Sequence, residues 1–239
     1  MTDLFLLIMG VQGAGKGTQA GYLCDKYRLL HISTGDLFRA MASRTDPLAL
    51  HVKSTINAGI LVDDETTNAV LQDRLEQPDV QTHQGVLLDG YPRNEAQAQW
   101  LTGYLEGKGK SVDAVLVLEL DLYTAFKRSF GRVTSPDGKR AFNIFSNRDG
   151  VQWDFEKSLD DKFPPRLVAS FKGSGEALKR RVDDADAFAV IGRIEKFLNE
   201  TRPVLPYYEG LGILETVDAD QPIETVREQL FSIIDERKK

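Results

Sequence analysis

The sequence predicts an α/β fold in which a five-stranded parallel sheet is flanked by helices. Short runs of consecutive apolar residues, rich in Val, Ile and Leu, alternate along the chain with stretches of helical spacing. Strands buried on both faces have this continuous apolar character, which is typical of parallel sheets covered by helices on both sides. In addition, the glycine-rich stretch "GVQGAGKGTQ" directly follows the first apolar run. A strand, a glycine-rich turn and a helix in this order are expected at a phosphate-binding site.

The elements follow in order along the chain. The predicted strands are residues 4–9, 29–33, 86–89, 114–120 and 213–217. Helical spacing predicts helices at residues 16–27, 66–76, 94–107, 122–130 and 223–238. Asp63, Asp64 and Glu65 place carboxylates at the positive end of the helix that follows them. Pro222 suits the first turn of the last helix.

Residues 131–184 interrupt this alternation. The stretches "SPDGKR", "SNRDG", "FPPR" and "KGSG" are turn or loop sequences, and the segment is too long for a plain connection. It is either an inserted subdomain that moves or a disordered excursion. Its aromatic residues provide a small core and favour the subdomain. We therefore predict one domain, 1–239, with an insertion at 131–184, and residues 185–239 forming core helices and the last strand.

Composition excludes several classes of protein. The 239 residues carry a formal net charge of −6, which argues against general binding of nucleic acids or anionic membranes. The single cysteine, Cys24, excludes a disulfide within one chain and a cysteine zinc site, and the three histidines are scattered, so we expect no zinc. Residues 4–9 are too few to span a membrane and no basic segment precedes them. We expect a reduced, cytoplasmic protein.

The pattern Gly10-x-x-x-x-Gly15-Lys16-Gly17-Thr18 indicates a phosphate-binding loop (P-loop), and with it a sheet of the P-loop NTPase type. Glycine allows positive φ angles, so successive N–H groups can point inward around an anion. The helix N-terminus adds partial positive charge, and the lysine reaches the outer phosphates. The predicted ATP-phosphate contacts are Gly13, Ala14, Gly15, Lys16, Gly17 and Thr18. The motif alone does not separate a kinase from a GTPase or a motor.

Asp89 ends the apolar run "GVLLDG" and is predicted to lie at the carboxyl edge of the sheet, where open α/β sheets bind ligands. A carboxylate near bound phosphates orients Mg²⁺ through water, and Thr18 is a second candidate for metal contact. The alternative is that Asp89 caps a helix.

A wider set of motifs resembles the adenylate kinases. The stretches "GVQGAGKGTQA", "HISTGDLFRA", "GILV", "LLDGYPRNEAQA", "FGR", "RVDD" and "TRPVLPYY" occur in the order and spacing of that family. The resemblance spans residues 5–230 and is weakest at 133–179. It implies a P-loop nucleoside-monophosphate kinase with a small helical AMP-binding segment at 33–62 and a lid at 131–184.

On the acceptor side, the resemblance implies AMP contacts by Thr34, Arg39, Gly59, Val62, Gly90, Arg93, Gln97, Arg181 and Arg193. Arginine suits a phosphate because its planar donors bind two oxygens together. Gln97 can offer a donor and an acceptor to the N6/N1 edge of adenine. Thr34 and Gln97 favour AMP over the pyrimidine monophosphates, whereas Asn94 is similar to the pyrimidine enzymes.

On the donor side, Arg128 resembles the arginine that stacks on the ATP base, and Arg132 a lid arginine that contacts phosphate. Arg181, in "RVDD", resembles the second lid arginine, although the spacing leaves Arg180 as an alternative. Asp183 and Asp184 follow it. The resemblance implies catalytic roles for Lys16, Arg93, Arg132, Arg181 and Arg193. The lid is longer than the usual long type, and with Cys24 far away in sequence it does not resemble the four-cysteine zinc lid.

These features predict an enzyme that transfers the γ-phosphoryl group of ATP to AMP, reversibly and with Mg²⁺, giving two ADP. No general base is needed, because the attacking phosphate is already ionised near neutral pH. The expected partners are ATP, AMP and ADP, and we expect a monomer. Two alternatives are a kinase for UMP, CMP or dAMP, and a catalytically weak nucleotide-binding regulatory protein. A GTPase is disfavoured because the chain lacks the Asn-Lys-x-Asp motif that reads guanine.

Overall fold

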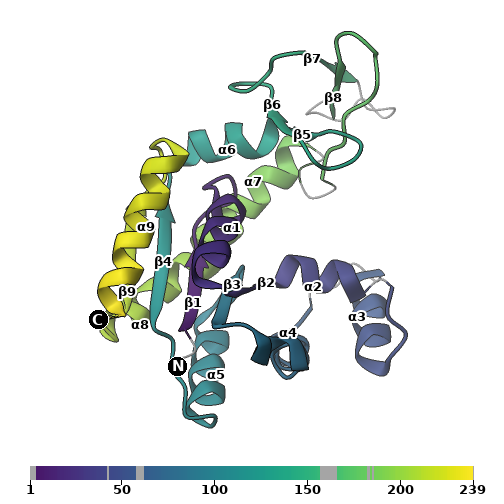
Figure 1. Ribbon diagram of the computed structural model, residues 1–239. Coiled ribbons are helices and arrows are strands. Elements are labelled where there is room, and N and C mark those ends of the chain that lie inside the picture. Colours follow the sequence, from purple (N-terminus) through teal and green to yellow (C-terminus); the bar gives the residue numbers. More distant parts are fainter. Residues whose placement is uncertain are drawn as a thin grey trace. The chain divides into compact units, whose positions relative to one another are not determined.

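A computed structural model describes residues 4–41, 43–57, 62–156, 166–181, 184 and 186–238 (Figure 1). The chain divides into two compact units. The first unit comprises Met1–Gly10, Gly15–Glu119 and Asn199–Lys239, and the second comprises Val11–Ala14 and Leu120–Leu198.

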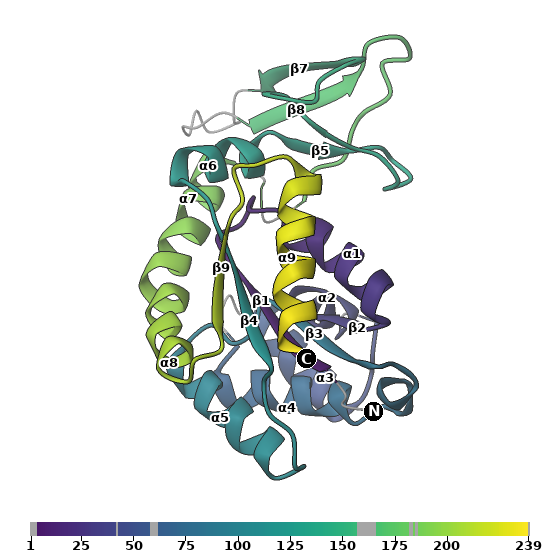
Figure 2. The ribbon, with the colours of Figure 1, turned by 60° about the vertical axis from the view of Figure 1, so that its left-hand side comes forward.

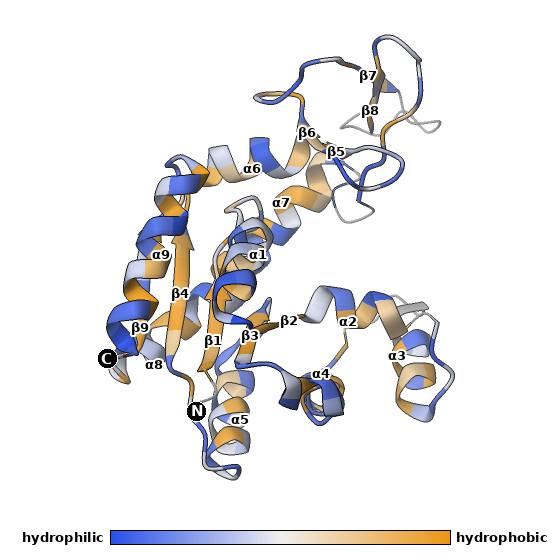
Figure 3. Ribbon diagram, viewed as in Figure 1, coloured by the Kyte–Doolittle hydropathy of each residue, from blue (hydrophilic) through white to orange (hydrophobic). Residues whose placement is uncertain are grey.

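The first unit contains the predicted parallel sheet. Its strands are β1 (Leu4–Met9), β2 (Leu30–Ser33), β3 (Gly85–Asp89), β4 (Ala114–Glu119) and β9 (Leu214–Asp218), in the order β2-β3-β1-β4-β9. Every neighbouring pair is parallel, which confirms the predicted fold class. The strands begin and end within one residue of the predicted positions. Figure 3 shows β1 and β4 as almost continuously hydrophobic, as expected of strands that helices cover on both faces.

Helices lie on both faces of this sheet. On one face α1 (Lys16–Tyr27) contacts β1, β2 and β3, and α9 (Ile223–Arg237) contacts β9 and α1 (Figure 2). On the other face, α5 (Glu95–Glu106) and α8 (Leu205–Gly210) share a hydrophobic core with alternate strand residues such as Phe5, Leu7 and Met9. Because side chains alternate across a strand, the intervening buried residues Leu6 and Ile8 face α1 and α9.

Three further helices of the first unit form a small cluster of their own. These helices are α2 (Thr34–Met41), α3 (Pro47–Asn57) and α4 (Asp64–Leu75). Met41, Ala49, Val52 and Val70 form its buried core, with Val62 packed against them. The α4 helix begins two residues before the predicted start, because the side chain of Asp63 accepts a hydrogen bond from the backbone N–H of Thr66 and caps the helix.

The second unit contains α6 (Leu122–Phe130), α7 (Ala187–Lys196) and two antiparallel strand pairs. The pairs are β5 (Arg132–Thr134) with β6 (Ala141–Asn143), and β7 (Val151–Glu156) with β8 (Arg166–Phe171). Its buried core is formed by Val133, Val151, Ala169 and Leu178, against which Phe142, Trp153 and Phe171 pack. The aromatic residues of the insertion thus provide packing, and the alternative of a wholly disordered excursion does not hold for the described residues.

Short helical turns complete the structure: η1 (Pro78–Thr82), η3 (Phe197–Thr201) and η4 (Arg202–Val204). None of the helices in the described part of the chain is both long and apolar enough to cross a membrane.

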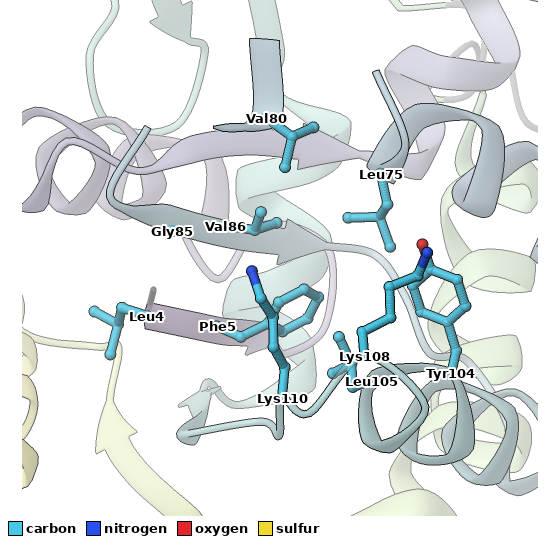
Figure 4. Close-up of a pocket in the computed structure, with 10 residues that line it drawn as sticks. All are labelled: Leu4, Phe5, Leu75, Val80, Gly85, Val86, Tyr104, Leu105, Lys108 and Lys110. Atoms are coloured by element: carbon cyan, nitrogen blue, oxygen red, sulfur yellow. The ribbon is translucent and has the colours of Figure 1, made fainter. Parts of the chain in front are cut away.

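A cavity of about 80 Å³ lies at the amino ends of β1 and β3 (Figure 4). Leu4, Phe5, Val86 and Leu105 line it. Parallel α/β sheets bind ligands at the carboxyl ends of their strands, so this cavity is at the opposite edge from the predicted site, and none of the predicted site residues lines it.

Candidate functional site

The pairing register of the sheet brings three chain segments to one edge. In β1 and β3, Ile8 lies opposite Asp89, and in β2 and β3, Ser33 lies opposite Asp89. The P-loop follows β1, and Thr34 directly follows β2. The carboxyl ends of these neighbouring strands therefore place the start of the P-loop, Asp89 and Thr34 next to one another, as the sequence predicts.

The P-loop has the backbone conformation that its glycines allow. Gly10 has φ +142°, and a Cβ atom there would lie 2.5 Å from the carbonyl oxygen of Leu118. Gly15 has φ +91° and immediately precedes α1. The first turn of α1 has neither a side-chain cap nor an acidic residue, which suits a helix end that binds an anion. The Lys16 ammonium donates to the Gly10 carbonyl oxygen at 2.7 Å, so the lysine lies against the loop.

Asp89 stands at the end of β3 with its side chain 16% exposed. Its carboxylate Oδ2 lies 3.7 Å from Nε2 of His31, on β2. The hydroxyl of Thr18 is on the first turn of α1. A carboxylate and a hydroxyl are the oxygen donors that Mg²⁺ prefers. Among the described residues, no three His, Cys, Asp or Glu side chains gather into a metal-binding group of their own.

On the acceptor side, the carbonyl oxygen of Gly90 organises two predicted contacts. It accepts hydrogen bonds from Thr34 Oγ1 and from Arg93 Nε, both at 2.9 Å. Thr34 is buried, whereas Arg93 is exposed. The structure thus brings three of the predicted AMP-binding residues together just beyond β2 and β3.

Gln97 is buried and belongs to a partly buried hydrogen-bond network beside them. Its Oε1 accepts from the backbone N–H of Arg93 at 2.8 Å, and its Nε2 donates to Asp64 Oδ1 at 2.6 Å. Asn94 caps α5 by accepting from the backbone N–H of Gln97, and its Nδ2 donates to Asp64. The cap gives Asn94 a structural role that does not depend on the substrate.

Of the other predicted acceptor residues, Arg39 and Val62 belong to the small helical cluster, whereas Arg181 and Arg193 belong to the second unit. Arg39, on α2, forms an exposed ion pair with Asp36 at 2.5 Å. Partial burial raises the pKa of the Asp36 carboxyl. The hydrogen bonds and charge of the Arg39 guanidinium, together with Ser33, lower it by more, so the pKa of Asp36 lies below its ordinary value. Such exposed pairs are weak, so a phosphate can replace the carboxylate. Gly59 lies outside the described residues.

In the second unit, the loop residues Val11–Ala14 pack against α6 and α7. A Cβ on Gly13 would lie 3.2 Å from Cβ of Arg128, and 2.7 Å from the carbonyl oxygen of Ala125. Gln12 Nε2 donates to the carbonyl oxygen of Val190, on α7, at 2.9 Å. The P-loop residue Gly13 and the predicted base-stacking arginine Arg128 are therefore neighbours.

Asp184 holds two of the predicted phosphate arginines. Its side chain is fully buried; Oδ1 accepts from Arg193 Nη1 at 2.8 Å, and Oδ2 accepts from Arg132 Nη2 at 2.5 Å. The two guanidinium groups come from β5 and α7, far apart in sequence. A single buried carboxylate thus sets the spacing between them.

The two alternatives for the second lid arginine, Arg180 and Arg181, differ in their surroundings. Arg180 is half-buried, its Nη2 donates to the carbonyl oxygen of Phe130 at 2.6 Å, and its guanidinium lies 5.1 Å from the centre of the Phe130 ring. Burial lowers the pKa of Arg180. Arg181 is exposed. The guanidinium of Arg180 is thus engaged by Phe130, whereas that of Arg181 is accessible to solvent. Asp183 lies outside the described residues.

Two features of the site were not predicted. Asp64 was interpreted only as a partner of the helix dipole, and its contact with Gln97 gave no sequence signal because the two residues are 33 positions apart. The bridging role of Asp184 likewise depends on two arginines brought together by the fold. For Asp184, the only signal in the sequence was its place in the stretch "RVDD", which begins with the predicted lid arginine Arg181.

A five-stranded parallel sheet with a P-loop after its first strand and a carboxylate ending the neighbouring strand defines a P-loop NTPase. Comparison with known proteins is more specific. The adenylate kinase family model matches residues 8–213. The chain is 36% identical to an adenylate kinase of Shouchella clausii over 233 residues, covering 98% of this chain and 99% of the relative. It is 38% identical to an adenylate kinase of Streptomyces coelicolor over 222 residues, covering 92% and 94%.

The chain belongs to the adenylate kinase family. An adenylate kinase of Bacillus cytotoxicus gives the same result, with 36% identity over 221 residues. The resemblance inferred from the motifs is confirmed.

Two neighbouring glycines of the P-loop provide a matched pair of variants. Gly15→Ala places a side chain at φ +91°, a strained conformation for an L-residue, which we expect to cost about 1–2 kcal/mol of stability and to weaken ATP binding. Gly17→Ala, within the first turn of α1 and in open space, is expected to stabilise by about 0.5 kcal/mol. Urea unfolding and calorimetric titration with ATP measure both effects. Equal effects of the two substitutions would contradict this account of the loop.

Asp184→Asn tests the bridge between the lid arginines. The substitution keeps the volume but removes the buried negative charge between Arg132 and Arg193, so we expect a loss of about 3 kcal/mol in the free energy of unfolding. The matched control is Asp186→Asn, since the side chain of Asp186 caps α7 and asparagine caps equally well. Urea unfolding followed by tryptophan fluorescence is suitable because Trp153 is in this unit. A loss as small as that of the control would show that Asp184 is not the shared counter-charge.

Proposed function

We propose that this protein catalyses reversible transfer of the γ-phosphoryl group of ATP to AMP, giving two ADP. The observation that carries the proposal is the shared edge of β1, β2 and β3. There Asp89 ends β3, and the P-loop start, Thr34 and Gly90 directly follow the ends of neighbouring strands of one sheet. A phosphate-binding loop and an acceptor site with an arginine, Arg93, thus occur side by side in a member of the adenylate kinase family.

The reaction needs positioning and charge more than acid–base chemistry. An oxygen of the AMP phosphate forms the new bond to the γ-phosphorus, the bond from this phosphorus to the bridging oxygen breaks, and ADP leaves. The attacking phosphate is already ionised at neutral pH, so no general base is required. Lys16 compensates the negative charge on the outer phosphates, and the inward N–H groups of the P-loop hold them in place.

Mg²⁺ fits the donor groups at this edge of the sheet. Asp89 and Thr18 offer a carboxylate and a hydroxyl, both hard oxygen ligands, beside the phosphate loop. We propose that Asp89 orients the ion through water. Bound with ATP, the ion would neutralise charge on the β- and γ-phosphates.

We further propose that residues 131–184 act as a lid and residues 33–62 as the AMP-binding segment, within one kinase domain. Arg132, Arg181 and Arg193 then supply positive charge to the transferring group. The shared carboxylate of Asp184 supports this for two of them, because it fixes their guanidinium groups before substrate binds. We also propose a cytoplasmic location, where the adenine nucleotides are abundant.

The direct test is to incubate the purified protein with Mg·ATP and, separately, AMP, CMP, UMP or GMP, and to separate the products by ion-exchange chromatography. We expect ADP to accumulate when AMP is the acceptor, and to form much more slowly when CMP, UMP or GMP is the acceptor. Preferred turnover of CMP or UMP would retain the chemistry but contradict the assigned acceptor. ATP binding without turnover of any acceptor would contradict the kinase assignment.

Arg93→Ala should lower kcat/KM for AMP by about 100-fold, since one charge-assisted contact to the acceptor phosphate is lost in the transition state. The fold should persist, because the side chain of Arg93 is exposed and lies outside the hydrophobic core. The matched control is Arg74→Ala, which removes the same charge from an ion pair with Asp79 elsewhere in the unit. A near-normal kcat/KM for Arg93→Ala would refute its assignment.

A further inference from the structure

The carboxamide of Gln97 is held by two partners that each have a single hydrogen-bonding role. The backbone N–H of Arg93 can only donate, and it reaches Oε1 at 2.8 Å. The Asp64 carboxylate can only accept, and it receives Nε2 at 2.6 Å. Rotating the carboxamide by 180° would set donor against donor and acceptor against acceptor. The two partners therefore fix which way the amide points.

Asp64 is itself held in place. Asn94 Nδ2 lies 2.9 Å from both of its carboxylate oxygens, and Asn94 Oδ1 accepts from the Gln97 backbone N–H at 2.9 Å. Asp64, Asn94 and Gln97 thus form a closed ring of hydrogen bonds. Asn94 and Gln97 both donate to Asp64, and the Gln97 backbone N–H donates to Asn94. Gln97 is only 5% exposed, so water competes little for these bonds.

This orientation has consequences for the base that Gln97 contacts. A carboxamide has two N–H groups and two lone pairs on its oxygen. One of each is used by Asp64 and Arg93, which leaves capacity for one donated and one accepted bond. Adenine presents an amino donor at position 6 beside the N1 acceptor, so it matches. Hypoxanthine and guanine present a carbonyl acceptor at position 6 beside an N1–H donor, which is the reverse pattern.

We propose that Asp64 is a specificity-determining positioning residue: by fixing the carboxamide of Gln97, it makes the acceptor site select 6-aminopurine nucleotides and reject 6-oxopurine nucleotides. The inference rests on the proposed function, in which Gln97 contacts the acceptor base. The new element is that selectivity between the two kinds of purine depends on the Asp64 carboxylate, which acts through Gln97. Without this carboxylate, only the backbone N–H of Arg93 fixes the carboxamide, so Gln97 turns over more readily and discriminates less between the two patterns.

The experiment compares AMP with IMP. The two nucleotides differ only in the group at position 6 and in the proton on N1. The ratio of their dissociation constants therefore reports which pattern of hydrogen-bond donor and acceptor the site presents. Asp64→Asn retains the shape of the side chain but can present an N–H to Gln97. We expect the ratio of the dissociation constants for IMP and AMP, measured by titration calorimetry, to fall by about tenfold. The ratio of kcat/KM values should fall in parallel, mainly through KM.

Asp63→Asn is the matched control. It removes the same charge one residue away at the same end of α4, and asparagine preserves the cap that Asp63 provides to Thr66. We expect this variant to keep the wild-type ratio for IMP and AMP. Thermal melting of both variants verifies that each is folded under the assay conditions.

The calorimetric ratio separates the inference from the proposed function, because it needs no turnover. An equal weakening of AMP and IMP in Asp64→Asn, with the ratio unchanged, would show that Asp64 is merely structural and would overturn the inference. So would a wild-type protein that binds IMP as tightly as AMP. Selective AMP binding that Asp64→Asn relaxes would support the inference even if no ADP formed, whereas the missing ADP would refute the kinase assignment.

Discussion

The site depends on the register between β3 and its two neighbours. Ile8 of β1 and Ser33 of β2 both lie opposite Asp89 of β3. Because parallel strands end at one edge, the segments that follow them begin side by side. A slip of one residue would turn every side chain of a strand to the other face, so burial of β1 and β3 on both faces holds their register in place. The hydrophobic core thereby determines where the phosphate loop meets the acceptor residues.

Groups with one hydrogen-bonding role fix the polar side chains of the site before any substrate arrives. The Gly90 carbonyl accepts from Thr34 and Arg93, and the Asp184 carboxylate accepts from Arg132 and Arg193. In the function that we propose, substrate phosphates would meet donors that need little reorganisation, which is the main requirement of phosphoryl transfer. Gln97 is fixed in the same way by Arg93 and Asp64, and we propose that this determines which base the site accepts.

Local signals in the sequence predicted most of the fold. Continuous apolar runs identified all five strands of the sheet, and the glycine pattern from Gly10 to Gly17 located the phosphate loop. Asp63 to Glu65 indicated the start of α4 to within two residues. These features depend on neighbours in the chain, so the sequence alone contains them.

Contacts between distant residues could not be predicted in this way. The pairing of Arg132 with Asp184 spans 52 positions, and that of Gln97 with Asp64 spans 33. Arg180 and Arg181 are equivalent in sequence, and only the packing of Arg180 on Phe130 separates them. The family resemblance supplied roles for many of these residues, but not the carboxylates that orient them.

The most direct measurement of the central claim supplies ADP alone. With Mg²⁺ and purified protein, phosphorus NMR should show ADP converting to ATP and AMP in equal amounts until equilibrium, and a Lys16→Met variant prepared in the same way should leave ADP unchanged over the same period. Equal amounts would mean that the shared edge of the sheet holds a donor and an acceptor nucleotide together. ADP that persists, or that yields AMP and inorganic phosphate without ATP, would contradict the account.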